Sequence, residues 1–180
     1  MKYFIAIFIM VSSLIYSQTS VMINEIMSSN SSTLQDEDND YSDWIEIYNP
    51  TSTTVNLNGF SITDDPTNLQ KWIFPDIDIA ADEYLIVFAS GKDRTGPELH
   101  TGFSIKSAGE TLILSDAITQ IVDQVDAIEI PGDISYGRDN SNPTQWLFYN
   151  EATPGAENNT QGYIGFSENP IFSIEGGFYS

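Results

Sequence analysis

Residues 43–49, which read DWIEIYN, carry the clearest structural signal in the chain. Two isoleucines alternate there with Trp44, Glu46 and Tyr48, and this two-residue period is typical of a β-strand whose faces lie in different surroundings. Residues 83–89 (EYLIVFA) are apolar on both faces, as expected of a central buried strand. No apolar helical period longer than two turns occurs, so the chain is predicted to be all-β.

Seven further short runs rich in β-branched and aromatic residues surround these two. They are residues 21–27, 55–63, 71–74, 111–115, 121–127, 134–137 and 146–149. Turn signals such as Asn58-Gly59 and Pro154-Gly155 punctuate the series. Strands that recur about every 8–12 residues with turns between them predict a β-sandwich or a barrel, and the lack of alternating helices argues against a doubly wound sheet.

The composition excludes several classes of function. The 180 residues carry 26 acidic and 6 basic side chains, a formal net charge of −20, and 41% of them are hydrophobic. The chain can therefore bury a core, while its negative surface argues against direct binding of nucleic acid or of anionic membranes. The absence of cysteine excludes disulfides, thiol catalysis and thiolate metal sites, and a single histidine excludes a multi-histidine metal site.

Residues 1–17 have the layout of a secretory signal peptide. Lys2 precedes an apolar run that ends at Ile15, and this run is shorter than the roughly 20 residues needed to cross a bilayer. We therefore expect cleavage after Ser17, a secreted or cell-surface location, and no membrane span after cleavage. Export without cysteine favours a bacterial protein.

The strand pattern weakens after residue 158. Residues 156–162 (AENNTQG) have the composition of a linker, and residues 163–180 contain a strand-like PIFSI and a Gly-Gly turn. We expect 159–180 to be a linker followed by the start of a second β-domain that this sequence does not include. The alternative is a C-terminal strand that packs back on the sandwich.

A series of motifs from residue 21 to residue 158 resembles the bacterial lamin tail domain family. The motifs are 23–26 (INEI), 40–49 (DYSDWIEIYN), 57–65 (LNGFSITDD), 71–75 (KWIFP), 83–92 (EYLIVFASGK), 100–103 (HTGF), 108–112 (AGETL), 135–138 (SYGR) and 153–158 (TPGAEN). No single motif is decisive, but together they follow the family's order. Residues 163–180 also show a short resemblance to the start of a chitobiase-type C-terminal β-domain.

The resemblance implies an immunoglobulin-like β-sandwich of about seven to nine strands over residues 21–158. It implies no catalytic centre. Bacterial members occur as modules of larger secreted or surface proteins, often beside hydrolase, nuclease or spore-coat-kinase-like regions.

The residues themselves offer little catalytic chemistry. A Ser-His-Asp triad needs a histidine to transfer the proton, and His100 is the only histidine in the chain. No Gly-x-Ser-x-Gly elbow and no phosphate-binding glycine loop is present. His100 lies in a predicted turn, where we expect its ring to bond backbone groups and stiffen that turn. We therefore expect a protein that is not an enzyme.

Five acids fall within the eight residues 36–43, a density that suggests calcium binding or a solvated loop. The candidate calcium ligands are Asp36, Asp38, Asp40 and Asp43. Tyr41 and Ile47 stand where an EF-hand loop needs glycine and glutamate, so an EF-hand is excluded and only a looser calcium site stays open. Calcium is the one cofactor that the sequence suggests.

Glu46 shares a strand face with two aromatic residues, so its environment is the open question. A buried carboxylate needs a cation or hydrogen-bond donors. The alternatives are a glutamate at a sheet edge in water, an ion pair with Lys71 or Arg138, or a metal ion shared with Glu25.

Tryptophan rings can stack on sugars, but in a sandwich they more often belong to the core, and we expect core positions for Trp44, Trp72 and Trp146. The sequence thus predicts a non-catalytic interaction module that binds a protein or a surface polysaccharide, or positions a neighbouring domain. The alternatives are the N-terminal accessory part of an extracellular hydrolase or spore-coat-kinase-like protein, and a calcium-dependent adhesion or carbohydrate-binding domain.

Overall fold

The computed structural model describes residues 21–167, and all of the regular structure in this interval is β. The strands are β1 (Met22–Met27), β2 (Asp43–Tyr48), β3 (Val55–Asn56), β4 (Ser61–Thr63), β5 (Trp72–Ile73), β6 (Asp78–Ile79), β7 (Tyr84–Ala89), β8 (Arg94–Thr95), β9 (Leu99–His100), β10 (Leu112–Ser115), β11 (Ile121–Val125), β12 (Ser135–Asp139), β13 (Asn142–Tyr149) and β14 (Gly162–Tyr163). The predicted signal peptide, 1–17, lies outside the described residues. Within them, no helix has the length and apolar character that a bilayer crossing requires.

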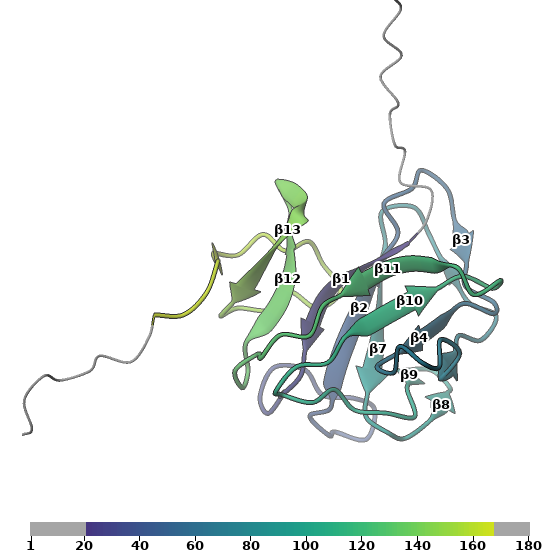
Figure 1. Ribbon diagram of the computed structural model, residues 1–180, viewed down its shortest axis with the longest axis horizontal. Coiled ribbons are helices and arrows are strands. Elements are labelled where there is room, and N and C mark those ends of the chain that lie inside the picture. Colours follow the sequence, from purple (N-terminus) through teal and green to yellow (C-terminus); the bar gives the residue numbers. More distant parts are fainter. Residues whose placement is uncertain (1–20, 168–180) are drawn as a thin grey trace, which may run out of the picture.

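Two larger sheets form a sandwich (Figure 1). The large sheet has the strand order β14-β13-β12-β1-β2-β7-β9-β8, and the smaller one has the order β11-β10-β4-β5. A third sheet contains only β3 and β6. Neighbouring strands are antiparallel except for β7 and β9, which are parallel. The predicted all-β, immunoglobulin-like sandwich is confirmed.

The main core lies between these sheets. Ile45 and Ile47 of β2 and Val87 of β7 face Leu112 and Leu114 of β10, and all five side chains are fully buried. The alternation in 43–49 therefore has a simple cause, because every second residue of β2 points into the core. Burial of such side chains is the main free-energy gain of the fold.

The other face of the large sheet also carries buried side chains. Trp44 packs with Met27 and Phe88 in a second, smaller apolar cluster. Trp44 and Trp72 are buried, as expected. Trp146 differs from the prediction, since its ring is only half-buried and packs against the edge of the core.

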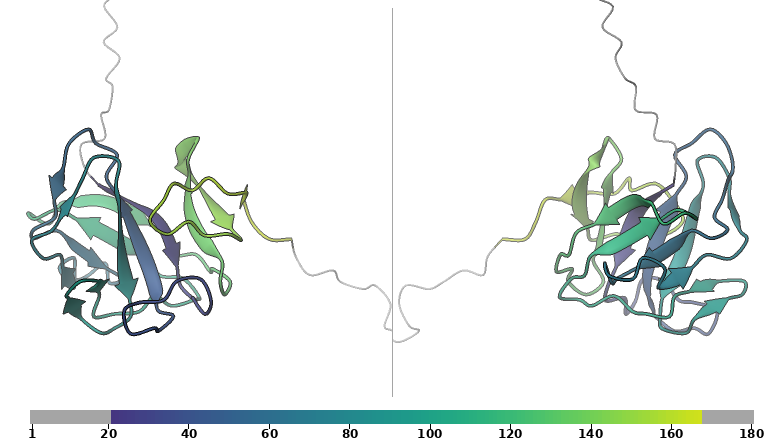
Figure 2. Two further views of the ribbon diagram at one scale, coloured as in Figure 1. Left: turned by 180° about the vertical axis from the view of Figure 1, so that it is seen from behind. Right: turned by 45° about the vertical axis from the view of Figure 1, so that its right-hand side comes forward.

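The β12–β13 hairpin extends the large sheet past the smaller one (Figures 1 and 2). Arg138 fastens it to the sandwich. The Nη2 atom of Arg138 lies 2.8 Å from both carboxylate oxygens of Asp123, and its Nε donates to the carbonyl oxygen of Ile23. Asp123 also accepts the Ile23 N–H at 2.8 Å, and the guanidinium lies 4.8 Å from the centre of the Trp146 ring. One ion pair thus joins β1, β11 and β12.

Three features of the strand pattern differ from the sequence-based expectation. The run 55–63 divides into β3 and β4, because Gly59 adopts a φ of 80° in the turn between them. The short strands β6, β8 and β9 fall in segments expected to be turns. β14 begins at the last residue of the predicted linker 156–162, and its Tyr163 pairs with Phe148 at the edge of the sheet. Residues 168–180, with most of the predicted start of a second domain, lie outside the described residues.

Removing the Asp123 carboxylate tests the role of this ion pair. We expect Asp123→Ala to lower the free energy of unfolding by about 2–4 kcal/mol, because it leaves the largely buried Arg138 guanidinium without its anion. Urea denaturation measures the change. Lys106→Ala, which breaks an exposed pair with Glu110, is the control and is expected to change little. Equal effects of the two substitutions would contradict the assignment.

Candidate functional site

Glu25 on β1 and Glu46 on β2 are direct partners in the sheet register, and neither side chain is exposed to solvent. The expectation of a glutamate at a sheet edge in water is therefore wrong for Glu46. Pairing with a cation is wrong as well, because Lys71 binds Asp64 and Arg138 binds Asp123. Two carboxyl groups instead lie side by side in the interior.

Hydrogen-bond donors from distant parts of the chain surround the Glu25 carboxyl. The Ser135 hydroxyl donates to Oε1 at 2.5 Å, and the Thr153 N–H donates to Oε2 at 3.2 Å. These contacts require β12, which carries Ser135 and Gly137, to lie close to β1. A side chain at Gly137 would place its Cβ 2.5 Å from the Asn158 amide nitrogen and 3.1 Å from the Glu25 side chain, so both residues would have to shift to admit it.

The Glu46 carboxyl is held in the same way. The Asn24 side-chain amide donates to Oε1 at 2.8 Å, and the Gly155 N–H donates to Oε2 at 2.5 Å. Asn158 completes the arrangement by donating to the Arg138 carbonyl oxygen at 2.9 Å. The motif at 153–158 thus closes over the motif at 23–26.

Burial controls the protonation of this pair. It raises the pKa of Glu46 to about 8, in spite of the donors from Asn24 and Gly155, and the neighbouring Glu25 adds to the rise. Burial also raises the pKa of Glu25. At neutral pH the Glu46 carboxyl is therefore mainly protonated. The contacts described for both groups are hydrogen bonds, and a metal ion shared between them stays a prediction.

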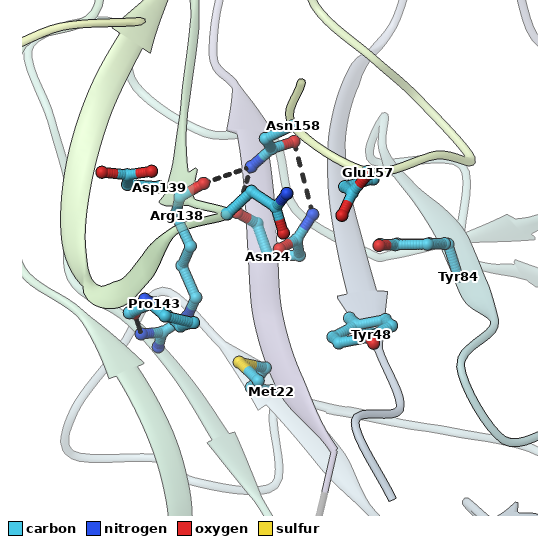
Figure 3. A pocket seen from close by; sticks show the side chains of 10 residues that line it. Met22, Asn24, Tyr48, Tyr84, Arg138, Asp139, Pro143, Glu157 and Asn158 are labelled. Carbon is cyan, nitrogen blue, oxygen red and sulfur yellow. Dashed lines mark hydrogen bonds between the residues drawn. The ribbon is translucent and has the colours of Figure 1, made fainter. Parts of the chain in front are cut away.

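A pocket of about 70 Å³ opens beside this pair, between the large sheet, the β12–β13 turn and the closing loop (Figure 3). Its lining residues are Met22, Asn24, Tyr48, Tyr84, Arg138, Asp139, Asn140, Pro143, Glu157 and Asn158. Figure 3 shows the two tyrosines on one side and Arg138 with Pro143 on the other. Segments more than 100 residues apart in the sequence therefore form one concave surface.

Two stacked tyrosines form one wall of the pocket. The rings of Tyr48 and Tyr84 lie 4.5 Å apart between centroids, at an interplanar angle of 20°. Burial raises the pKa of Tyr84 to about 12, and the nearby acidic groups add to the rise in the order Tyr48, Glu46, Glu157 and Asp82. The wall therefore combines aromatic surface with a negative potential, which suits a cationic group or a flat polar one. The sequence alone does not reveal this pair, because the partnership of Tyr48 with Tyr84 follows from the strand register.

The predicted calcium ligands divide into two groups. Asp36, Asp38 and Asp40 converge on the ammonium group of Lys92, at 2.6, 2.8 and 2.9 Å. Burial alone would raise the pKa of Asp36, but Lys92 and nearby hydrogen-bond donors outweigh it and hold that pKa at about 2. Lys92 thus supplies the positive charge that the acidic turn needs, and calcium binding by these aspartates stays a prediction.

Asp43 is not part of this cluster. Its carboxylate lies 3.5 Å from the backbone N–H of Asn30, and burial raises its pKa to about 6. The structure therefore brings together three of the four candidate calcium ligands.

His100 also lies in a different environment from the one predicted. Its ring is fully buried and contacts side chains rather than backbone groups, with Nδ1 2.9 Å from the Ser90 hydroxyl and Nε2 2.8 Å from the Glu37 carboxylate. No sequence pattern indicates this contact, because Glu37 lies 63 positions before His100.

The raised pKa of Glu46 predicts a dependence of stability on pH. The folded state keeps its proton up to about pH 8, whereas the unfolded state releases it near 4.5, so this contribution to stability is complete below pH 4.5 and is lost between pH 4.5 and 8. Between about pH 6 and pH 8, where Asp43 no longer contributes, we expect the unfolding free energy of Glu46→Gln to decrease less with pH than that of the wild type. Urea titrations at several pH values measure it. The exposed Glu129→Gln variant should keep the wild-type slope.

The assignment of Lys92 as the cation of the acidic turn is tested by Lys92→Met. Three carboxylates are then left without their common partner. With a chelator present, we expect the free energy of unfolding to fall by about 2 kcal/mol. Calcium should restore part of this loss in the variant and have a smaller effect on the wild type. Thermal denaturation with calcium or chelator measures both. If calcium stabilised the wild type and the variant equally, calcium would not be binding at the position that the Lys92 ammonium occupies.

Comparison with known proteins places this fold in a family. A search of curated proteins gave no match. The family model described as Lamin Tail Domain matches residues 16–129. The match includes β1, β2 and β7, which carry Glu25, Glu46 and both pocket tyrosines. Since the matched interval is more than half of the chain, this protein belongs to the lamin tail domain family.

Proposed function

We propose that this chain is a non-catalytic interaction module of an exported protein, and that the pocket beside Tyr48 and Tyr84 receives a positively charged segment of a partner protein. The observation that carries this proposal is the stacked tyrosine pair bordered by carboxylates. Membership of a family of non-enzymatic, immunoglobulin-like domains supports the general part, and residues 1–17 support export.

The charge distribution favours a cationic partner. Every lysine and arginine in residues 21–167 already forms an ion pair with an acid of the same chain. The pairs involve Lys71, Lys92, Arg94, Lys106 and Arg138. The remaining carboxylates, including Glu157 and Asp139 at the pocket, have no such partner among the described residues. Complementary charge speeds encounter and selects partners.

The hydrogen-bonded chain of Ser90, His100 and Glu37 has the connectivity of a catalytic triad, but its setting supports a structural role. His100 is fully buried, and the Ser90 hydroxyl accepts the N–H of Lys92 at 3.2 Å. The pocket beside the tyrosines is lined by none of the three residues. A triad also needs a substrate within reach of the hydroxyl and donors for the developing oxyanion.

Binding to oligolysine tests the proposal. The full chain should bind this probe saturably, and Tyr84→Ala should weaken binding about tenfold, because the cation loses an aromatic face in a partly desolvated pocket. Isothermal titration calorimetry measures both affinities. Tyr41→Ala, which removes an exposed ring from the acidic turn, is the matched control and should bind as the wild type does.

Two results would count against this function. Equal affinities of the Tyr84 and Tyr41 variants would show attraction to the acidic surface as a whole rather than to the pocket. Binding of a neutral oligosaccharide that is lost in Tyr84→Ala, with oligolysine binding unchanged, would assign the pocket to a surface polymer instead.

A further inference from the structure

Glu37, Glu98 and His100 bring two carboxylates and one imidazole to a single point, away from the tyrosine pocket. One ligand atom of each residue lies within 4.8 Å of those of the other two. Glu37 comes from the acidic turn, while Glu98 and His100 lie at β9. We propose that these three residues bind a divalent transition-metal ion, for which zinc is the appropriate probe.

The imidazole is held as a metal-binding histidine is held. Its ring is fully buried and stacks on Phe88 with 5.2 Å between centroids. Nδ1 contacts the Ser90 hydroxyl at 2.9 Å, so the ring is fixed from behind. Nε2 faces the Glu37 carboxylate. Metal-bound histidines almost always bond a polar group through the other ring nitrogen, and that contact sets the ring orientation.

The neighbouring carboxylates of Glu37 and Glu98 favour the binding of a cation between them. The Glu37 N–H donates to Oε2 of Glu98 at 2.7 Å, and this contact holds the two carboxyl groups close together. Arg94 reaches only the other oxygen of Glu37, at 3.3 Å, and Glu98 has no ion-pair partner among residues 21–167. Two neighbouring carboxylates repel each other unless a proton or a cation lies between them. The adjacent acidic cluster differs, because there the Lys92 ammonium already supplies the charge.

The geometry and the access also fit a metal ion. Tetrahedral zinc bound at about 2.0–2.2 Å holds its ligand atoms roughly 3.3 Å apart. The 2.8 Å between Nε2 of His100 and Oε2 of Glu37 would therefore open by about half an ångström as the ion replaces the proton between them. Solvent reaches two of the three residues, because Glu98 lines a hollow of about 180 Å³ and the Glu37 side chain is 31% exposed. Water would complete the coordination.

The single histidine makes the test direct. The full chain, purified without a histidine tag and treated with chelator, is titrated with zinc chloride while the ring nitrogens of His100 are followed by NMR. We expect Nε2 to shift to a metal-bound position, with saturation at about one equivalent and reversal by chelator. An imidazole signal that does not change with zinc would overturn the proposal.

Variants locate the ion without altering the buried ring. Glu98→Gln is expected to weaken zinc binding by about tenfold or more in calorimetric titration, while Asp40→Asn, in the neighbouring Lys92 cluster, should leave it within about twofold of wild type. Circular dichroism confirms that both variants fold. Unchanged affinity in Glu98→Gln, or an equal loss in Asp40→Asn, would place the ion elsewhere and overturn the assignment.

Discussion

Glu25 and Glu46 face each other across β1 and β2 where water does not reach. Two adjacent buried carboxyl groups are unfavourable unless donors and a retained proton offset the loss of water. The donors come from Ser135 and from the loop at 153–158, far along the chain. That loop therefore belongs to the folded unit, although only Asn158 of it is buried, and the unit extends past the interval 16–129 that matches the family model.

The same closure creates the surface that we propose for binding. Residues 153–158 bring Glu157 and Asn158 beside Tyr48 and Tyr84, and the ion pair of Arg138 places the β12–β13 turn opposite them. The loop that supplies hydrogen-bond donors to the buried Glu25 and Glu46 carboxyl groups thus also forms one wall of the pocket. The walls of the pocket come from five separate segments of the chain, so the pocket depends on the packing of the loop at 153–158 against the sheet.

Charge has two different roles in this molecule. Close to the described cations, acids act in groups, as when Lys92 holds three aspartates of one turn. Elsewhere, apart from buried groups such as Glu25 and Glu46, many acids are exposed and give the surface its negative charge. Glu37 belongs to the same acidic turn, but Glu98 and His100, which lie beside it, form no ion pair with a lysine or arginine among the described residues.

The sequence by itself determined the class of the fold. The alternation in 43–49 and the apolar run in 83–89 predicted β2 and β7, because a period of two residues has one structural meaning. Only the second half of β13 was predicted, and β6, β8, β9 and β14 were missed because two-residue strands carry no period. Of the candidate site, the sequence indicated Asp36, Asp38 and Asp40 but neither their lysine nor the tyrosine pair. Only the tertiary structure decided those contacts and the burial of Glu46, since pairing between distant strands depends on register and packing of the whole chain.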